Sequence, residues 1–172
     1  SSTILKAMNR GYTKEQYIAL ANKIKERIPG VALTADIIVG FPGETEEDFQ
    51  DTLDVVREIQ FDNSFMFMYS IRKGTRAATM ENQIDEAVKK DRLQRLIDVQ
   101  TACSLAESKT YVGKTVRVLV EGESKKNKEV LSGRTSTNKI VLFKGDKALE
   151  GTFVNVKIND CKTWTLYGEI VE

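Results

Sequence analysis

The 172-residue sequence predicts two folded units: an α/β unit of parallel strands and helices over residues 1–107, and a small all-β barrel over residues 108–172. In the first unit, two apolar segments enclose an amphipathic helix, which is the order of a right-handed parallel crossover. In the second unit, about five short strand segments punctuated by glycines follow one another, a pattern typical of a closed antiparallel barrel of OB type.

The charge changes sign at the same boundary. Residues 1–107 contain 14 Lys and Arg against 17 Asp and Glu, whereas residues 108–172 contain 12 against 8. Such an asymmetry indicates two units with different partners.

The composition is that of an ordinary globular protein, with 41% hydrophobic and 30% charged residues. No apolar run approaches the roughly 20 residues that span a bilayer, and no basic-then-apolar leader is visible. We therefore expect no membrane partner and a cytoplasmic location. The oligomeric state stays open.

Side chains for acid–base and metal chemistry are scarce. The sequence contains no His, which removes the commonest general base and any Ser-His-Asp triad. Its two cysteines, Cys103 and Cys161, are far apart, and no Cys or His lies near either of them. Neither a zinc or iron–sulfur motif nor a disulfide framework is recognisable. We expect no catalytic and no metal-binding residue in this chain.

Local signals mark the helices of the first unit. Thr13 and Gln16 form a capping box for a helix that Pro29-Gly30 ends. Thr45 caps the next helix, with acidic residues in its first turn. The apolar stripe of that helix predicts four buried residues: Phe49, Leu53, Val56 and Ile59. A long charged helix is expected over Asp85–Lys109.

Two strands are expected on either side of the Thr45 helix. Val31–Val39 reads as a buried strand, so the carboxylate of Asp36 within it needs a partner. Phe61–Tyr69 has large apolar residues at alternate positions on both faces, which predicts burial on both faces. Parallel strands end at the same edge, so Gly40-Phe41-Pro42 should lie beside Tyr69–Arg72 where α/β proteins bind ligands. Two strands are too few for a closed core, and the abrupt start at Ser1 suggests that the front of an α/β barrel precedes it.

Three segments carry a resemblance to a known family: Asn9–Thr13, Thr34–Phe49 (TADIIVGFPGETEEDF) and Tyr69–Thr75. They resemble the back half of the TIM-like core of radical S-adenosylmethionine methylthiotransferases. Residues 108–172 are similar to the TRAM domain, an RNA-binding barrel attached to these enzymes. Leu131–Thr135, with Asn138, Lys139 and Phe143, resembles the MiaB-type branch that acts on tRNA. Ile71 and Arg76 depart from the family, which often has Pro at both places.

The resemblance implies a transferase that adds a methylthio group to an isopentenylated adenosine beside the anticodon. It implies S-adenosylmethionine and two 4Fe-4S clusters as cofactors, and the tRNA anticodon stem-loop as partner. The Cys-x-x-x-Cys-x-x-Cys motif that holds the catalytic cluster is absent from these residues. The chain by itself is therefore expected to be inactive but able to bind RNA. Two alternatives stay open: a ribosomal-protein methylthiotransferase and a non-catalytic RNA-binding protein.

The resemblance also implies which residues approach the cofactor. Arg10 matches a carboxylate, since a guanidinium binds one bidentately. For Asp36, a structural role as a hydrogen-bonded carboxylate has the same weight as cofactor binding. For the turn at Gly40, a structural role as a tight turn has less weight than cofactor binding. The full set of expected cofactor contacts is Ser2, Arg10, Asp36, Val39, Gly40, Tyr69 and Arg72.

Basic residues of the second unit are the expected phosphate contacts, because such contacts supply most nucleic-acid affinity. The structural alternative is that the charged run at residues 125–128 is a solvated hairpin tip that binds no ligand. The expected set is Lys125, Lys126, Lys128, Arg134, Asn138, Lys139 and Lys144. Of the aromatic residues, Phe143 is expected in the core, while Trp164 is open to either a core or a base-stacking role.

Overall fold

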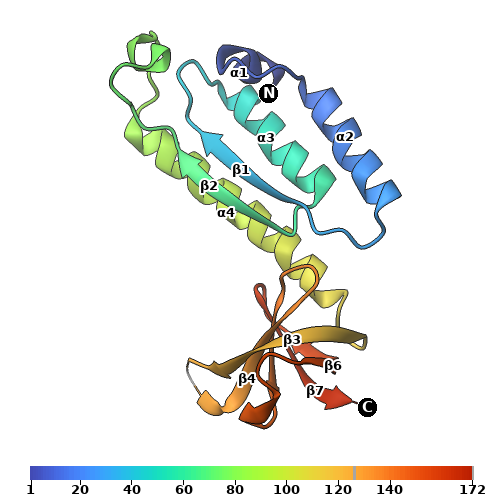
Figure 1. Cartoon of the computed structure of the whole chain (residues 1–172). Helices are drawn as coiled ribbons and strands as arrows, with labels where there is room; N and C mark the ends of the chain where they lie inside the picture. The colour runs from blue at the N-terminus through green and yellow to red at the C-terminus, as the bar shows by residue number, and fades with distance from the viewer. Residues whose placement is uncertain (126, 172) are drawn as a thin grey trace. The chain divides into compact units, whose positions relative to one another are not determined.

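The computed structural model describes residues 1–125 and 127–171. The chain divides into two compact units, Ser1–Cys103 and Ser104–Glu172 (Figure 1). The boundary drawn from the sequence, at residue 107, falls in the same helix as this division. No helix in the described ranges is long and apolar enough to cross a membrane.

The first unit contains a parallel strand–helix–strand crossover. Strand β1 (Thr34–Val39), helix α3 (Glu46–Ile59) and strand β2 (Asn63–Met68) follow one another, and the two strands pair in parallel. The remaining elements are α1 (Ser2–Ala7), α2 (Lys14–Arg27), a 3₁₀ turn η1 (Arg76–Thr79) and α4 (Glu86–Lys109). The predicted crossover and the long final helix are confirmed.

Capping boxes start α2 and α3; the sequence predicts the box of α2 and, for α3, the Thr45 cap. The Thr13 hydroxyl accepts a bond from the Gln16 amide, and the Gln16 side chain accepts one from the Thr13 amide at 2.9 Å. Thr45 and Asp48 repeat the arrangement in α3, at 3.1 and 3.0 Å. These bonds satisfy amide groups that have no partner within the helix. The four-residue stripe of α3 is buried as expected.

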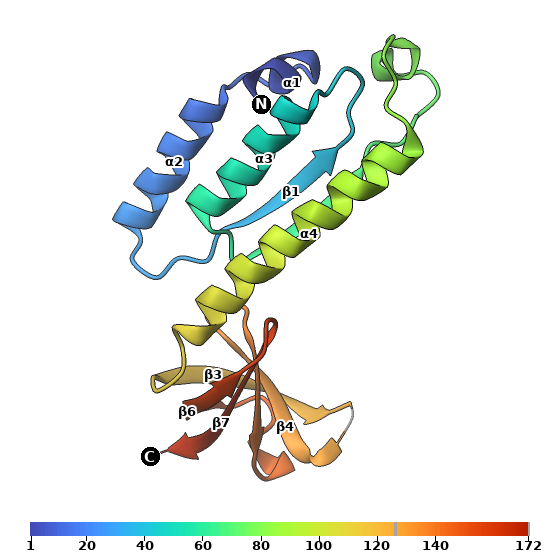
Figure 2. The ribbon, with the colours of Figure 1, turned by 180° about the vertical axis from the view of Figure 1, so that it is seen from behind.

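Within the described residues, helices cover one face of the β1–β2 sheet and leave the other open. Helices α2, α3 and α4 lie against the covered face (Figure 2), and Val39, Phe61 and Leu96 join the α3 stripe in the core. The expected burial of β2 on both faces is wrong, because Phe65 is 61% exposed and Phe67 is 50% exposed. Asp36 and Ile38 of β1 lie opposite these two residues and are exposed as well, so the expectation of a buried Asp36 is also wrong.

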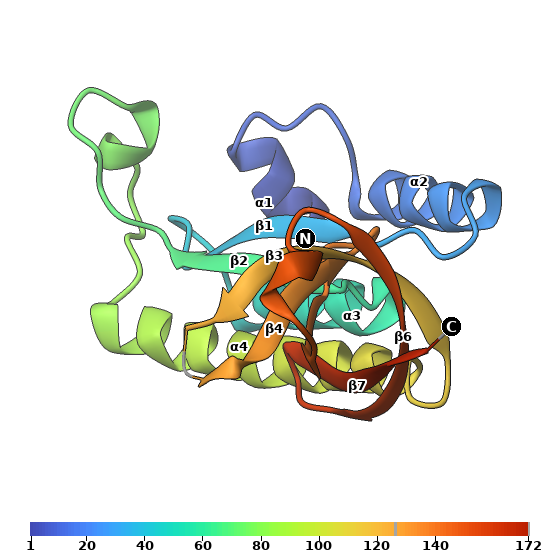
Figure 3. The same ribbon diagram turned by 60° about the horizontal axis from the view of Figure 1, so that its bottom comes forward.

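The second unit is a closed five-stranded barrel (Figure 3). Its strands are β3 (Thr115–Ser124), β4 (Asn127–Thr135), β5 (Ile140–Lys144), β6 (Phe153–Cys161) and β7 (Thr165–Val171), with a 3₁₀ turn η2 (Lys147–Leu149) before β6. The order β3-β4-β5-β7-β6 is a correction to a purely antiparallel barrel, because β5 and β7 pair in parallel. Strand β6 follows β5 along the chain but pairs with the other edge of β7. Strands β5 and β7 are therefore neighbours and run in the same direction.

Glycine permits close approach of strands in the barrel wall. A Cβ at Gly133 would lie 2.5 Å from the Leu119 carbonyl oxygen and 2.5 Å from Val118 Cγ1. Inside the ring, eight residues form the core: Val118, Val120, Leu131, Val141, Phe143, Val156, Ile158 and Leu166. The expected core position of Phe143 is confirmed, since it is 2% exposed.

Candidate cofactor cavity and nucleic-acid interface

The turn after β1 is held in shape by its own residues. Gly40 has φ +75°, and its amide donates to Glu44 Oε1 at 2.8 Å. The Glu44 amide donates to the Phe41 carbonyl at 3.0 Å, and the Gly43 amide donates to the Asn82 carbonyl at 2.9 Å. The Gly40 amide is therefore engaged by a carboxylate of the same turn.

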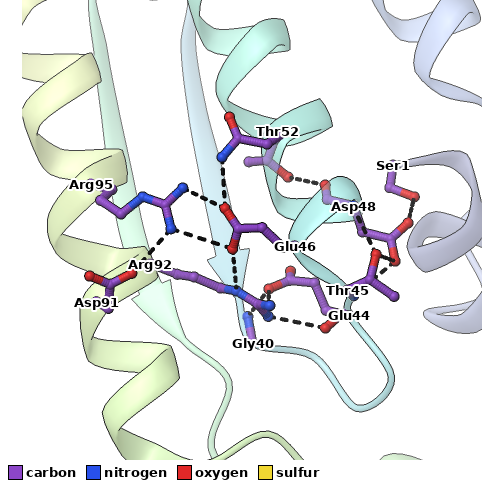
Figure 4. Close-up of polar contacts among 11 residues, drawn as sticks. Ser1, Gly40, Glu44, Thr45, Glu46, Asp48, Thr52, Asp91, Arg92 and Arg95 are labelled. Atoms are coloured by element: carbon purple, nitrogen blue, oxygen red, sulfur yellow. Dashed lines mark hydrogen bonds and ion pairs between the residues drawn. The ribbon is translucent and has the colours of Figure 1, made fainter.

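A buried ion pair connects this turn to α4 (Figure 4). Arg92 Nη1 lies 2.8 Å from Glu44 Oε1 and 3.1 Å from the Glu44 carbonyl, and the two side chains are 6% and 3% exposed. Burial raises the pKa of Glu44 above its ordinary value, and the bonds from Gly40 and Arg92 oppose the shift without cancelling it. Among the described residues, Arg92 Nε is buried without a hydrogen-bond partner, with Glu46 Oε2 at 3.7 Å.

Around this pair lies a second, more exposed layer of charge. Arg95 bonds to Glu46 at 2.5 Å and to Asp91 at 3.1 Å, and its guanidinium lies 4.8 Å from the centre of the Phe49 ring. The sequence patterns above did not predict this network. The available signal was a basic residue, Arg92, four positions before the buried Leu96 on α4, which indicates that an acidic partner is needed.

The carboxyl ends of β1 and β2 meet as predicted. The Tyr69 amide donates to the Val39 carbonyl at 2.8 Å, and the rings of Phe41 and Tyr69 pack edge to face at 5.3 Å. Lys89 Nζ from α4 donates to the Tyr69 carbonyl at 3.2 Å. The glycine-rich turn and the end of β2 thus form one continuous surface.

Two cavities open beside this edge, and both include residues of the uncovered face of the sheet. One of about 500 Å³ has Arg10 and Asp36 among its lining residues. The other, of about 520 Å³, has Tyr69 and Arg72. Met8, Ile38 and Phe67 line both. The structure therefore brings four of the seven expected cofactor contacts to neighbouring cavities.

The other three expected contacts have structural partners. Ser2 lies in α1, and its hydroxyl accepts a bond from the Lys14 amide at 3.0 Å. The Val39 side chain is fully buried in the core, and the Gly40 amide is bonded to Glu44. None of the three lines either cavity.

The donor groups present suit a polar organic ligand better than a metal cluster. Arg10 and Asp36 are exposed around one cavity, and the Tyr69 hydroxyl beside the other is buried without a hydrogen-bond partner in the described ranges. Among those residues, no group of three or more His, Cys, Asp or Glu is placed to hold a metal ion. Cys103 packs toward the Val56 carbonyl, and Cys161 belongs to the barrel. The two thiols do not fit an iron–sulfur cluster.

The expected RNA contacts of the barrel fall into two groups at opposite ends of β4. Lys125 lies in the β3–β4 connection, and Lys128 lies at the start of β4. Lys144 is near them because it pairs with Val130 of β4. All three are exposed. Lys126 was also expected to contact phosphate and lies outside the described residues. Arg134, Asn138 and Lys139 form the other group, around the β4–β5 turn.

The turn group is largely engaged within the barrel. Arg134 lies 3.2 Å from Glu121 and donates to the Asn138 side chain at 2.9 Å. Lys139 is 9% exposed, with its ammonium 5.8 Å from the centre of the Tyr111 ring. Asn138 is exposed and adopts φ +65°. The hairpin group presents freer cations than the turn group.

Comparison with known proteins matches both units. Residues 1–56 match the Radical SAM superfamily, and residues 109–171 match the TRAM domain. The chain is 76% identical over 171 residues to a tRNA-2-methylthio-N(6)-dimethylallyladenosine synthase of Fusobacterium nucleatum, covering 99% of this chain and 39% of the relative. Proteins of the same name from Alkaliphilus oremlandii and Acetivibrio thermocellus are 55% and 58% identical, over 100% and 99% of this chain and 36% of each relative.

The chain thus spans less than two-fifths of the length of these relatives. Within that span the match is continuous across both units, and the three relatives share one name, which refers to tRNA. The chain is thus similar over nearly its whole length to part of these tRNA-2-methylthio-N(6)-dimethylallyladenosine synthases, with a Radical SAM superfamily match over residues 1–56 and a TRAM domain over residues 109–171.

Proposed function

We propose that this chain supplies one wall of an S-adenosylmethionine site and an RNA-binding barrel to a tRNA methylthiotransferase. The observation that carries the proposal is the meeting of the β1 and β2 ends beside cavities lined by Arg10, Asp36, Tyr69 and Arg72. The complete activity would be methylthiolation of an isopentenylated adenosine beside the anticodon, in agreement with the name of the relatives. That activity would place the protein in the cytoplasm.

Each polar group at the cavities has a defined task in this proposal. The Arg10 guanidinium would bind the carboxylate of the cofactor, and Asp36 would accept a hydrogen bond from a cofactor amine or hydroxyl. Ile38 and Phe67 offer the apolar surface between them. When bound there, S-adenosylmethionine would provide the radical chemistry needed at the adenine ring of the substrate nucleoside. The two 4Fe-4S clusters would be held by cysteines other than Cys103 and Cys161.

The barrel would bind the anticodon stem-loop chiefly through phosphate contacts. Residues 1–107 would then face the cofactor, and residues 108–172 would hold the RNA. Lys125, Lys128 and Lys144 are exposed on one end of β4 and can neutralise phosphates. Arg134, Asn138 and Lys139 would contribute after exchanging their present partners.

Substitution of Arg10 tests the cofactor site. The test uses a protein of the relatives' length that carries these residues, with its clusters reconstituted. In it, Arg10→Gln should raise the Kd for S-adenosylmethionine about tenfold or more, because a charge-assisted bond is lost. Lys23→Gln, an exposed lysine of α2, is the control and should leave the Kd unchanged. A wild-type protein that forms no methylthiolated adenosine in isopentenylated tRNA would overturn the proposed activity. Equal Kd values for Arg10→Gln and wild type would remove Arg10 from the site.

A further inference from the structure

One part of the outer face of the barrel carries exposed apolar side chains. Phe153 on β6 lies opposite Leu119 on β3, and Leu119 lies opposite Arg134 on β4. Phe153 is 57% exposed and Leu119 is 37% exposed, although both are large apolar residues. An aromatic ring left this open in a small barrel calls for an explanation.

A guanidinium already lies on this ring. The Arg117 Cζ atom is 4.1 Å from the centre of the Phe153 ring, and Arg117 is exposed. In the described part of the barrel, no carboxylate forms an ion pair with Arg117, whereas Arg134 is paired with Glu121. The pair therefore combines an open aromatic surface with a cation that has no ion-pair partner among the described residues.

The neighbours of this pair favour a nucleic-acid ligand over a protein surface. On the same face of β3 and β6 lie Thr115, Asn155 and Lys157, all exposed and polar. Across the next strand, Glu169 lies opposite Lys157, and its carboxylate accepts a bond from Asn159 at 3.2 Å. Protein interfaces use larger continuous apolar areas with a charge-poor centre. Two apolar side chains edged by cations suit a planar base attached to a phosphate.

We propose that Phe153 and Arg117 form a stacking platform for one unpaired nucleotide of the bound RNA, with Leu119 as its apolar floor. This inference rests on the proposed RNA-binding function and adds a ligand class that the phosphate contacts do not specify: an unstacked base. The base stacks on the Phe153 ring and on the plane of the Arg117 guanidinium. The remaining N–H groups of Arg117 donate hydrogen bonds to the adjoining phosphate. The platform lies on β3 and β6 and is distinct from the lysines of the β3–β4 hairpin.

Binding of the 172-residue chain to two labelled RNAs tests the platform. The probes are a single-stranded oligoadenylate and a blunt RNA duplex of equal length, each followed by fluorescence anisotropy. Phe153→Leu should weaken binding of the single strand about tenfold, because base–aromatic stacking is lost, and should leave duplex binding within about twofold of wild type. Phe153→Trp should retain single-strand binding. Arg117→Gln should weaken binding and reduce its salt dependence.

Phe65→Leu is the matched control, since it makes the same change at an exposed phenylalanine of the first unit, which is 61% exposed. It should leave both affinities unchanged. Wild-type affinity of Phe153→Leu for the oligoadenylate would overturn the platform. So would an equal loss on both RNAs, or loss of self-association in sedimentation velocity with unchanged RNA binding, which would assign the face to a protein contact. If the wild-type chain binds neither RNA, the RNA-binding function fails first, and the platform fails with it.

Discussion

Gly40 meets two requirements that no other residue type meets together. Its φ of +75° lies in the left-handed region, and a Cβ at this position would overlap Lys89 Cγ and lie 2.8 Å from Lys89 Cδ. Lys89 cannot easily move, because its ammonium bonds to the Tyr69 carbonyl and pairs with Glu86. Lys89 therefore contacts both the Gly40 turn and the end of β2.

Gly40→Ala should therefore destabilise the chain more than a matched glycine substitution. Gly74 is the control, because it has φ +84° and nothing lies within 4 Å of the place that an added Cβ would occupy. Both alanines suffer left-handed strain, and Gly40→Ala should lose about 1–3 kcal/mol more for overpacking against Lys89. Urea unfolding measures the difference. Equal losses at the two positions would show that the Lys89 stem yields freely.

The Glu44–Arg92 pair allows a second test at the residue scale. Arg92→Met leaves a carboxylate buried without its cation, which should cost about 3–5 kcal/mol of unfolding free energy. The double variant Glu44→Leu/Arg92→Met should recover a large part of that loss, since no charge remains buried. Arg95→Met is the control, and with a side chain 36% exposed it should cost at most about 1 kcal/mol. Additive losses in the double variant would contradict a coupled pair.

At the scale of elements, the first turn of α3 makes stability depend on pH. The hydrogen bond from Arg95, followed by one from Gln50, lowers the pKa of Glu46 below its ordinary value of 4.5. A carboxyl whose pKa is lowered by folding stabilises the fold above its unfolded pKa, and that contribution is lost as the pH falls through the lowered value. Glu46→Gln should therefore flatten the decline of unfolding free energy below about pH 4.5.

Chemical denaturation between neutral and acidic pH measures this decline. The same substitution in an Arg95→Met background should change the slope less, because the main cause of the shift is already gone. If Glu46→Gln declines as steeply as wild type in both backgrounds, the stabilising role of the α3 turn is wrong.

Elements were predictable where their signals are local. The Thr13 and Thr45 caps involve residues three positions apart, and both capping boxes are present. Exposure of Phe65 and Phe67 was not predictable, because their alternation reports only that both faces are apolar and not which face is covered. The same limit applies to the parallel β5–β7 pair, which depends on the path of β6.

The site was predictable in its location and less so in its contacts. Parallel strand ends meet at one edge, so the neighbourhood of Gly40 and Tyr69 followed from the order of elements. The Glu44–Arg92 pair joins residues 48 positions apart, and no local pattern links them. Lys139 resembled a phosphate contact because a charge on a turn is usually exposed, yet the residue is 9% exposed and its ammonium lies 5.8 Å from the centre of the Tyr111 ring.

For the molecule as a whole, RNA affinity should depend on salt through the hairpin lysines. Replacing Lys128 and Lys144 with Gln should reduce the slope of log affinity against log salt by about 0.7 for each single-strand phosphate that is no longer neutralised. Lys23→Gln/Lys90→Gln is the charge-matched control, because both lysines are exposed and lie in the first unit. Titrations at several salt concentrations provide the slopes. A slope that is the same in all three proteins would remove the hairpin lysines from the interface.

The contrast between a closed ring and a two-stranded sheet has a consequence for amide hydrogen exchange. In the barrel each described strand has a neighbour on both sides, so amides that point to either side are bonded wherever both neighbours overlap. In the described part of the first unit, β1 and β2 have only each other. Every second amide along these strands points away from the pair and should exchange within seconds, while those between the strands are protected. Deuterium uptake should therefore divide Thr34–Val39 residue by residue and leave Val118–Val120, which have bonded neighbours on both sides, uniformly slow.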